Sequence, residues 1–254
     1  MDTDPQIISE RMDHALRLTL SSPKTKNALT KGMFVALNAA LDQALEDPDI
    51  RVVWLRGADG AFTSGNVMAE FAETVAGDTP VATWFLQKLA AFPKPVVAQV
   101  EGPAVAIGTT VLLHCDMVFA TDTAKFMLPF VNLGLVPEAG STTLLPKLAG
   151  HAKAAELLYL GGTFDAREGV EIGLVNKILT ADTLEETVAK TVSRLASQPP
   201  KALMKTKALL RKPLAGSVAD RMDEEMKVFE TCFTGEEFAE VGAAMREKRK
   251  PVFD

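Results

Sequence analysis

Strand-like and helical segments alternate along the chain as far as residue 179. Residues 14–20 (HALRLTL) alternate polar and apolar side chains, as a half-buried strand does. Further strands are predicted at 51–57, 95–102, 116–121 and 173–179. Helices are expected at 80–92, from about 107, and after the capping residue Thr30, where apolar residues recur at helical spacing at Phe34, Leu37, Leu41 and Leu45. The alternation predicts an α/β fold with crossover connections.

The strand pattern stops after residue 179, and from about Leu184 onward the chain is amphipathic helix interrupted by SQPP, KPLAG and FTG. We therefore predict an α/β core over residues 1–195 and a helical region over 196–254. So thin a helical region cannot build a strong core by itself, and we expect it to pack on the α/β core or on another subunit.

Charge and hydropathy exclude several classes of protein. The net charge is −6, whereas nucleic-acid binding usually needs a clustered basic surface. No apolar run approaches the roughly 18 residues of a membrane span, and the acidic N-terminus lacks the apolar stretch of a signal peptide. We therefore expect a cytoplasmic protein that binds neither nucleic acid nor membrane, with Cys115 and Cys232 as reduced, buried thiols. The basic C-terminal run of Arg246, Lys248, Arg249 and Lys250 is either a solvated helix end or an anion-binding segment.

Common catalytic motifs are missing from the chain. His14, His114 and His151 lack HExxH spacing and no CxxC occurs, so we expect no metal site. Neither a GxGxxG nor a GxxxxGK[ST] motif is present, which argues against a dinucleotide or P-loop site. FTSGN around Ser64 lacks the first glycine of a nucleophile elbow. Catalysis would have to use carboxylates and backbone dipoles, with no separate cofactor.

Two turns rich in small residues, GAFTSGNVMAEF (60–71) and VEGPAVAIGTTVLL (100–113), each lie between a predicted strand and a helix. Backbone N–H groups at such places can converge on an anion or a developing oxyanion. Two simpler interpretations stay open: Gly65 permits a tight turn, and the segment from Gly102 to Gly108 permits close helix packing.

Glu138 is the one carboxylate in NLGLVPEAGSTTLLPKL (132–148), where Leu133, Leu135 and Val136 precede it and Leu144 and Leu145 follow it. An ionised carboxylate in apolar surroundings costs several kcal/mol unless it is paired, protonated or used. We expect an apolar shell of Phe130, Leu135 and Val136 to raise its pKa toward neutrality. The alternative is a carboxylate that stabilises the N-terminus of the helix that follows.

In their order along the chain, SSPKTKNAL, AFTSGNVMAEF, KPVVAQVEGPAVAIGTTVLLHCDMVFATDTAKFMLPFVNLGLVPEAGSTTLLPKLAG, AAELLYLGGTFDAREGVEIGLVNKIL and EKRKPVF resemble the crotonase (enoyl-CoA hydratase/isomerase) superfamily over about residues 10–254. The resemblance implies a spiral of ββα turns, a C-terminal helical trimerisation region and an acyl-CoA thioester substrate. It also implies that the main-chain N–H groups of Asn66 and Ile107 hold the thioester oxygen, with Ser64, Gly65, Gly108 and Phe130 lining the substrate site.

Two glutamates serve crotonase-type hydratases, and the matching positions here are Thr110 and Phe130. Glu138 is similar in position to the catalytic glutamate of the Δ3,Δ2-enoyl-CoA isomerases, and SGN, GPAV and LVPEAGS look closest to their peroxisomal branch. The resemblance thus implies an isomerase of fatty acid metabolism in which Glu138 moves the proton. Val67 departs from the family's usual aspartate.

The same resemblance implies that Lys24 and Lys26 lie near the adenosine phosphates of coenzyme A, which is part of the substrate. It implies that Phe233 and Lys250 reach a neighbouring subunit's site within a homotrimer or a dimer of trimers. Other functions stay open: hydration, thioester hydrolysis or C–C cleavage on a specialised acyl-CoA, and a non-catalytic scaffold that binds coenzyme A.

Overall fold

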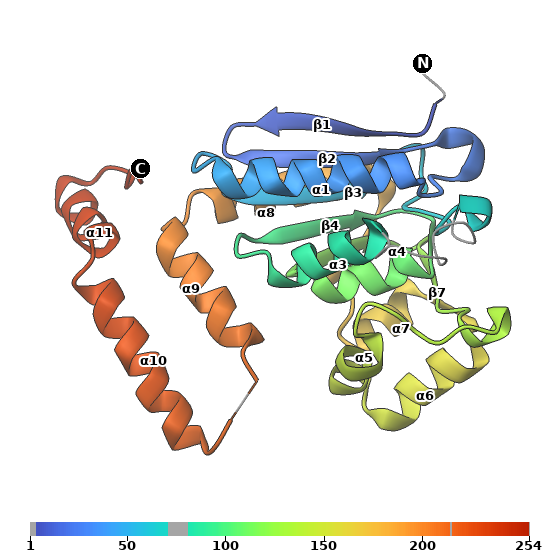
Figure 1. Ribbon diagram of the computed structural model, residues 1–254. Coiled ribbons are helices and arrows are strands. Elements are labelled where there is room, and N and C mark those ends of the chain that lie inside the picture. The colour runs from blue at the N-terminus through green and yellow to red at the C-terminus, as the bar shows by residue number, and fades with distance from the viewer. Residues whose placement is uncertain (1–3, 71–80, 214, 254) are drawn as a thin grey trace.

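A six-stranded sheet forms the centre of the computed structural model, which describes residues 4–70, 81–213 and 215–253 (Figure 1). Its order is β1-β2-β3-β4-β6-β9. β1 pairs antiparallel with β2, and every later pair is parallel, which requires the predicted crossovers. The strands are β1 (Gln6–Met12), β2 (Ala15–Ser21), β3 (Val52–Gly57), β4 (Val96–Val100), β6 (Met117–Thr121) and β9 (Lys177–Leu179).

The strands predicted at 14–20, 51–57, 95–102 and 116–121 correspond to β2, β3, β4 and β6. The strand predicted at 173–179 is shorter, because its first residues form a turn in which Gly173 has a φ of 79°. β1 was not predicted. Most of its residues are exposed, so they carry no alternating apolar pattern.

The structure has a second, smaller sheet of three strands. Its order is β5-β7-β8, with β5 parallel to β7 and β7 antiparallel to β8. Each strand has three residues, which is too short for a periodic signal in the sequence. The strands are β5 (Pro103–Val105), β7 (Lys125–Met127) and β8 (Thr163–Asp165).

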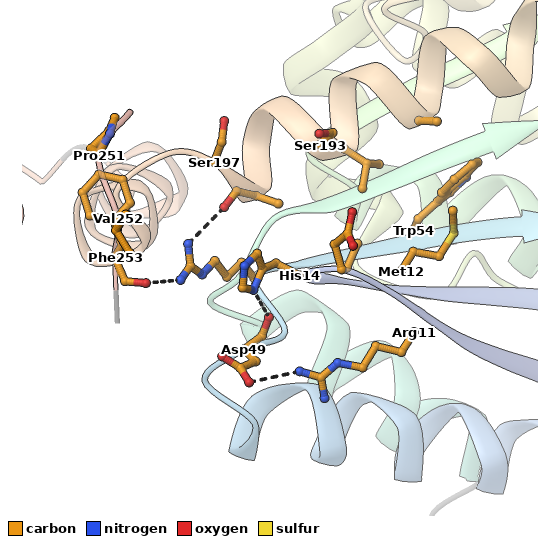
Figure 2. Close-up of a pocket in the computed structure, with 16 residues that line it drawn as sticks. Arg11, Met12, His14, Asp49, Trp54, Ser193, Ser197, Pro251, Val252 and Phe253 are labelled. Carbon is orange, nitrogen blue, oxygen red and sulfur yellow. Dashed lines mark hydrogen bonds and ion pairs between the residues drawn. The ribbon is translucent and has the colours of Figure 1, made fainter. Parts of the chain in front are cut away.

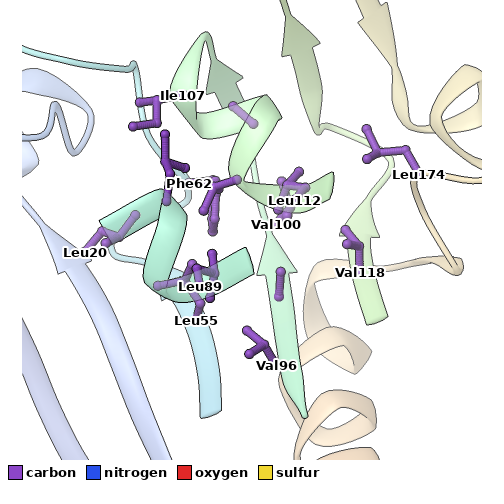
Figure 3. Packing of buried hydrophobic residues seen from close by; sticks show 14 of the residues in the cluster. Leu20, Leu55, Phe62, Leu89, Val96, Val100, Ile107, Leu112, Val118 and Leu174 are labelled. Atoms are coloured by element: carbon purple, nitrogen blue, oxygen red, sulfur yellow. The ribbon is translucent and has the colours of Figure 1, made fainter. Parts of the chain in front are cut away.

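Helices cover both faces of the main sheet, so alternate strand residues enter two different cores. On β3, Val53 and Leu55 join the larger core, which includes residues of α1 (Lys31–Glu46) and α3 (Val81–Ala91). Val52 and Trp54 join the smaller core under α8 (Ala181–Ala196). Figure 3 shows part of the larger core, in which Phe62 and Ile107 lie close together. The turns that carry these two residues therefore rest on the packed interior.

Helix α1 starts as predicted, because the Thr30 hydroxyl accepts a hydrogen bond from the N–H of Met33 at 3.2 Å. Phe34, Leu37 and Leu41 are buried. Leu45, which continues the apolar spacing, lies within the helix but is 48% exposed. It lies in the last turn of α1, where Ala44 takes the buried position.

Shorter elements connect the sheets and form a lobe beside them, with β7, α5, α6 and α7 close together (Figure 1). The helix predicted from residue 107 consists of α4 (Ile107–Thr110), a single α-helical turn, continued by the 3-10 helix η2 (Val111–His114). The others are η1 (Pro23–Thr25), η3 (Val131–Leu133), α5 (Ser141–Ala149), α6 (His151–Leu160) and α7 (Ala166–Glu171).

Three helices follow α8, namely α9 (Pro200–Arg211), α10 (Val218–Phe233) and α11 (Glu236–Glu247). α9 is fastened to the core by the Lys207 ammonium, which contacts the Asp116 carboxylate at 2.6 Å. We call α10 and α11 the C-terminal arm; Figure 1 shows them apart from the sheet, with α9 between. No helix in the described ranges is long and apolar enough to cross a membrane. The division at residue 195 stays a prediction.

The loop after β2 is joined to the first small-residue turn by Asn27, which is fully buried. Its side-chain oxygen accepts from the N–H of Ser22 at 2.8 Å, and its amide donates to the carbonyls of Ala58 and Ala61 at 2.8 and 2.7 Å. Its φ of 60° is left-handed, a conformation that asparagine tolerates better than most residues. One side chain thus sets the position of the 58–66 segment.

Asn27→Ala should destabilise the protein by roughly 3 kcal/mol, because the Ala61 carbonyl and the Ser22 N–H lose buried partners and the Ala58 carbonyl keeps only the N–H of Ala61. Asn27→Gly is the matched control: it loses the same bonds but relieves the left-handed strain, so it should be destabilised less. Urea unfolding of the three proteins measures both effects. Equal midpoints for Asn27→Ala and the wild-type protein would contradict the assignment.

Candidate functional site

The two small-residue turns are joined along their backbones. Thr63 and Ala104 form an isolated parallel bridge. The N–H of Phe62 donates to the carbonyl of Glu101 at 2.7 Å, and the N–H of Val105 donates to the carbonyl of Thr63 at 3.0 Å. Segments 40 residues apart in the sequence therefore form one surface.

Glycine is required where the turns meet. A Cβ on Gly108 would lie 2.5 Å from Cγ2 of Thr63. A Cβ on Gly65 would lie 3.1 Å from the carbonyl oxygen of Val105, and the φ of Gly65 is 96°. The simpler interpretation of both glycines, tight turning and close packing, is therefore correct. It also explains how the backbones come together.

Asn66 and Ile107, the two predicted oxyanion donors, follow these contacts directly. Among the described residues, no hydrogen-bond acceptor contacts either main-chain N–H. The N–H groups of both neighbours of Asn66 are used, since Gly65 donates to the hydroxyl of Thr63 at 3.0 Å and Val67 donates to the carbonyl of Leu29 at 3.0 Å. Both predicted donors are thus available to a ligand.

Ala106 directs the Ile107 N–H through an unusual backbone conformation. Its φ of 51° and ψ of −113° are costly for a residue with a Cβ, and such strain is typical of functional sites. The carbonyl of Ala106 accepts from the N–H groups of Thr109 and Thr110. The N–H of Ile107 is the first of α4, so the helix offers it no acceptor. Since α4 is one turn long, the main contribution here comes from the local N–H groups and not from a long helix dipole.

Glu138 points toward α4. Its carboxylate oxygen Oε1 accepts a hydrogen bond from the hydroxyl of Thr110 at 2.6 Å. The same hydroxyl lies 3.4 Å from the carbonyl of Ile107. The acid is therefore about one helical turn from one of the two predicted oxyanion donors.

Burial raises the pKa of Glu138 above its ordinary value, and the hydrogen bond from Thr110 opposes this shift. The sequence suggested that Leu135 and Val136 shield this acid, and that part is wrong: both are exposed, Val136 by 82%. The N–H of Leu135 bonds to the carbonyl of Phe130 at 2.8 Å, and the turn so formed holds its apolar side chains outside. Phe130 itself is buried, as expected.

The alternative of a helix-stabilising carboxylate is not supported by the geometry. α5 begins at Ser141, and its N-cap is Gly140. The main-chain carbonyl of Glu138 accepts from the N–H and the hydroxyl of Ser141 at 3.0 and 2.6 Å, whereas its carboxylate bonds to Thr110. The backbone of Glu138 supports the helix, and its side chain does not cap it.

Thr110 is the residue that the sequence interpretation missed. It was identified only as a position where hydratases have an acid, although it is fully buried and holds Glu138. Its position could have indicated this role, because it follows Ile107 by about one turn on the same helix. The threonine stands where hydratases have an acid, and its hydroxyl holds the carboxylate of Glu138.

Ser64, Lys24 and Lys26 lie beside the first turn. The Ser64 hydroxyl donates to the carbonyl of Thr25 at 2.7 Å, and its N–H donates to the carbonyl of Lys26 at 2.9 Å. Both lysines are exposed. Ser64 therefore has a structural use in fixing this loop, and the loop presents two cations near Gly65.

Phe233 and Lys250 are not brought to Glu138 within one chain. Phe233 stacks in the C-terminal arm on Phe229 and Phe238, with ring centroids 6.1 and 4.6 Å apart. Lys250 is exposed, and its carbonyl accepts from Arg249 at 3.1 Å. A contribution of either residue to a substrate site requires a second copy of the chain.

The predicted cysteines are less buried than expected, since both Cys115 and Cys232 are partly exposed. Both are free. Burial of the thiol nevertheless raises the pKa of Cys115 to about 12. The Cys115 thiol is therefore not activated as a nucleophile.

A cavity of about 780 Å³ lies elsewhere, between the β1–β2 turn, α8 and the C-terminal tail (Figure 2). Arg51 donates to the carbonyl of Ala196 at 3.3 Å and also to that of Phe253. None of the predicted site residues is among the described residues that line this cavity. It belongs to the docking of the tail and not to the site around Glu138.

Comparison with known proteins agrees with this geometry. Residues 10–254 match the family model for enoyl-CoA hydratase/isomerase. The chain is 32% identical over 97% of both sequences to a protein assigned as enoyl-CoA hydratase echA8 in Mycobacterium bovis. It is 37% identical to enoyl-CoA delta isomerase 2 of Rattus norvegicus, over 77% of this chain and 52% of that protein.

Solved structures have the same fold. A protein assigned as an enoyl-CoA hydratase/carnithine racemase from Magnetospirillum magneticum AMB-1 superposes with a TM-score of 0.93 at 39% identity, covering 98% of each chain. OdaA of Pseudomonas aeruginosa is 44% identical over 81% of this chain and 84% of its own, with a TM-score of 0.77. The whole-length match of sequence and fold means that this chain belongs to the enoyl-CoA hydratase/isomerase family of the crotonase superfamily.

Proposed function

We propose that this enzyme moves the double bond of a 3-enoyl-CoA to the 2-position. The observation that carries the proposal is the partly buried acid Glu138, hydrogen-bonded to Thr110 beside the oxyanion turns. Hydration of a double bond uses a second acid to direct water. Threonine and phenylalanine stand at positions 110 and 130, where the family's hydratases have theirs.

The reaction needs one group that takes a proton and returns it. The Glu138 carboxylate removes a proton from C2, and the electrons of that C–H bond form a C1=C2 bond as the thioester carbonyl electrons move onto the oxygen. In the second half the carbonyl re-forms, the C1=C2 electrons form the C2=C3 bond, and the original C3=C4 electrons accept the proton from Glu138 at C4. A raised pKa suits a group that is a base in the first half and an acid in the second. Because Thr110 holds Oε1, the second carboxylate oxygen is left for the substrate.

The intermediate carries negative charge on the thioester oxygen. In our proposal that oxygen accepts hydrogen bonds from the N–H groups of Asn66 and Ile107, both free of other described acceptors. Removing one such donor typically costs on the order of 3 kcal/mol in transition-state stabilisation. The strain at Ala106 is the structural cost of directing one of them.

Lys24 and Lys26 are proposed to contact the phosphates of coenzyme A, which enters as part of the substrate and not as a separate cofactor. Both are exposed and lie on the loop that contacts Ser64. Phe233 and Lys250 would contribute from a second copy of the chain. Hydration is the competing reaction, since the mycobacterial relative is assigned as a hydratase.

Isomerisation of a 3-enoyl-CoA should exceed hydration of a 2-enoyl-CoA by at least about a hundredfold, because a missing general acid or base typically costs 10²- to 10⁴-fold. Both rates are measured at equal enzyme and thioester concentration. Hydration that matches isomerisation would refute the proposal. Tight coenzyme A binding with neither activity would instead indicate another acyl-CoA reaction or a scaffold.

Glu138→Gln should lower turnover by about 10⁴-fold while thioester affinity changes little, because glutamine keeps the size of the side chain but exchanges no proton. In the wild-type enzyme the base must be ionised, so kcat/KM should fall as pH falls through a pKa above that of an ordinary glutamate. Folding stability should hold or rise slightly, because a poorly solvated charge is removed. A variant that retains a tenth of the wild-type rate would exclude Glu138 as the base.

The C-terminal arm should mediate association into a trimer or a dimer of trimers, because one face of α10 exposes Met222, Met226, Phe229 and Phe233. Light scattering of the wild-type protein should give the mass of three or six chains. Phe229→Glu should shift that mass toward one chain, whereas Lys227→Glu, which adds a carboxylate to another face of the same helix, should not. A wild-type monomer at micromolar concentration would contradict the proposal.

A further inference from the structure

The residue after the proposed catalytic acid adopts a strained conformation. Ala139 has a φ of 57°, in the left-handed region where a Cβ is unfavourable, and Gly140 follows with a φ of 66°. Such a conformation persists only where neighbouring contacts enforce it. Because Ala139 adjoins Glu138, whatever holds this peptide also sets where the carboxylate points.

The contact that holds Ala139 comes from His114, the last residue of η2. Its ring nitrogen Nε2 lies 2.8 Å from the carbonyl oxygen of Ala139. A carbonyl only accepts, so Nε2 carries the hydrogen. Burial lowers the pKa of His114 below its ordinary value, which favours the neutral imidazole.

His114 is itself fixed from α9. Arg211 donates from Nη2 to the carbonyl of His114 at 2.6 Å and to the Asp116 carboxylate at 3.1 Å. Asp116 also contacts the Lys207 ammonium at 2.6 Å. A continuous series of contacts thus runs from α9 through His114 to the peptide beside Glu138.

We propose that His114 is a positioning residue, whose Nε2–H holds the carbonyl of Ala139 and thereby keeps the Glu138 carboxylate on Thr110 and facing the substrate. The inference rests on the proposed function of Glu138. It concerns the placement of that acid and not the proton transfer itself, since the imidazole bonds to a main-chain carbonyl and not to the carboxylate.

Three substitutions separate positioning from packing. His114→Gln keeps an N–H donor at the ε position, His114→Phe keeps a ring without a donor, and His114→Asn has a donor too short to reach Ala139. Misplacement by about 1 Å can cost 10²-fold, so we expect kcat to fall roughly 10- to 100-fold in the Phe and Asn variants, with KM within about threefold. The Gln variant should recover to within about threefold of the wild-type kcat, well short of such a loss.

A crystal structure of His114→Phe gives a readout independent of activity: the Glu138 carboxylate should lie beyond hydrogen-bond distance of Thr110. If that variant fails to fold, His114→Asn, which introduces no extra bulk, replaces it in both measurements. Wild-type kcat in the variants without a reaching donor, or a loss in the Gln variant equal to theirs, would overturn the proposal. A Glu138 carboxylate that keeps its hydrogen bond to Thr110 in the crystal structure of the variant would overturn it as well.

Glu138→Gln assayed alongside distinguishes this failure from failure of the proposed function. If Glu138→Gln is inactive and His114→Phe has wild-type kcat, only the positioning by His114 is wrong. If Glu138→Gln keeps wild-type turnover, the proposed function is wrong, and the placement of Glu138 is then judged from the crystal structure alone. In the double variant, His114→Phe should add no further loss to that of Glu138→Gln, because no carboxylate is left to position.

Discussion

The site depends on the backbone contact between two turns that are far apart in the sequence. Hydrogen bonds between residues 62–63 and 101–105 bring them together, and glycine at position 108 allows the contact because any Cβ there would collide with Thr63. Asn27 fixes the start of the first turn with two side-chain hydrogen bonds, to the carbonyls of Ala58 and Ala61, and its third joins it to Ser22. The proposed donors Asn66 and Ile107 therefore belong to a unit that rests on Phe62 in the main core, which is the preorganisation that stabilisation of a developing charge would require.

Glu138 lies next to this unit, and two opposing effects act on its pKa. Burial raises the pKa of Glu138, and the Thr110 hydroxyl lowers it. The strained peptide at Ala139 is held by His114, and the carbonyl of Glu138 is held by Ser141. The carboxylate is thus partly desolvated without being left unpaired, a condition compatible with both giving and taking a proton.

The C-terminal helices join the core in two different ways. α9 contributes the buried ammonium of Lys207 and the exposed guanidinium of Arg211, both on the Asp116 carboxylate. The tail is fastened at Arg51, beyond the arm. The arm between these anchors keeps its apolar face exposed, which is the arrangement expected of a surface that a second copy covers. Arg211 also donates to the carbonyl of His114 at the end of η2. The contacts that attach α9 to the core are therefore continuous with the one between His114 and the peptide beside Glu138.

The sequence by itself determined much of the architecture. Four central strands, the capped start of α1 and the change to helices after β9 follow from periodicity and capping, which are local properties. The order of motifs also identified the family, and with it Glu138 as the acid to examine. β1 and the three-residue strands of the second sheet were not predicted from the sequence, because exposed or very short strands have no periodic apolar pattern.

Only the tertiary structure decided how these residues act on one another. That Thr110 holds Glu138 depends on a contact across 28 residues, and that His114 holds Ala139 depends on one across 25. The expected shielding by Leu135 and Val136 was wrong because a turn at Phe130 directs them to the surface. Periodicity in the sequence indicates which residues are apolar. Packing between distant segments sets the direction in which a loop turns and the hydrogen-bond partner of a partly buried acid such as Glu138. For this reason the acid could be named from the sequence, but its hydrogen bonds could not.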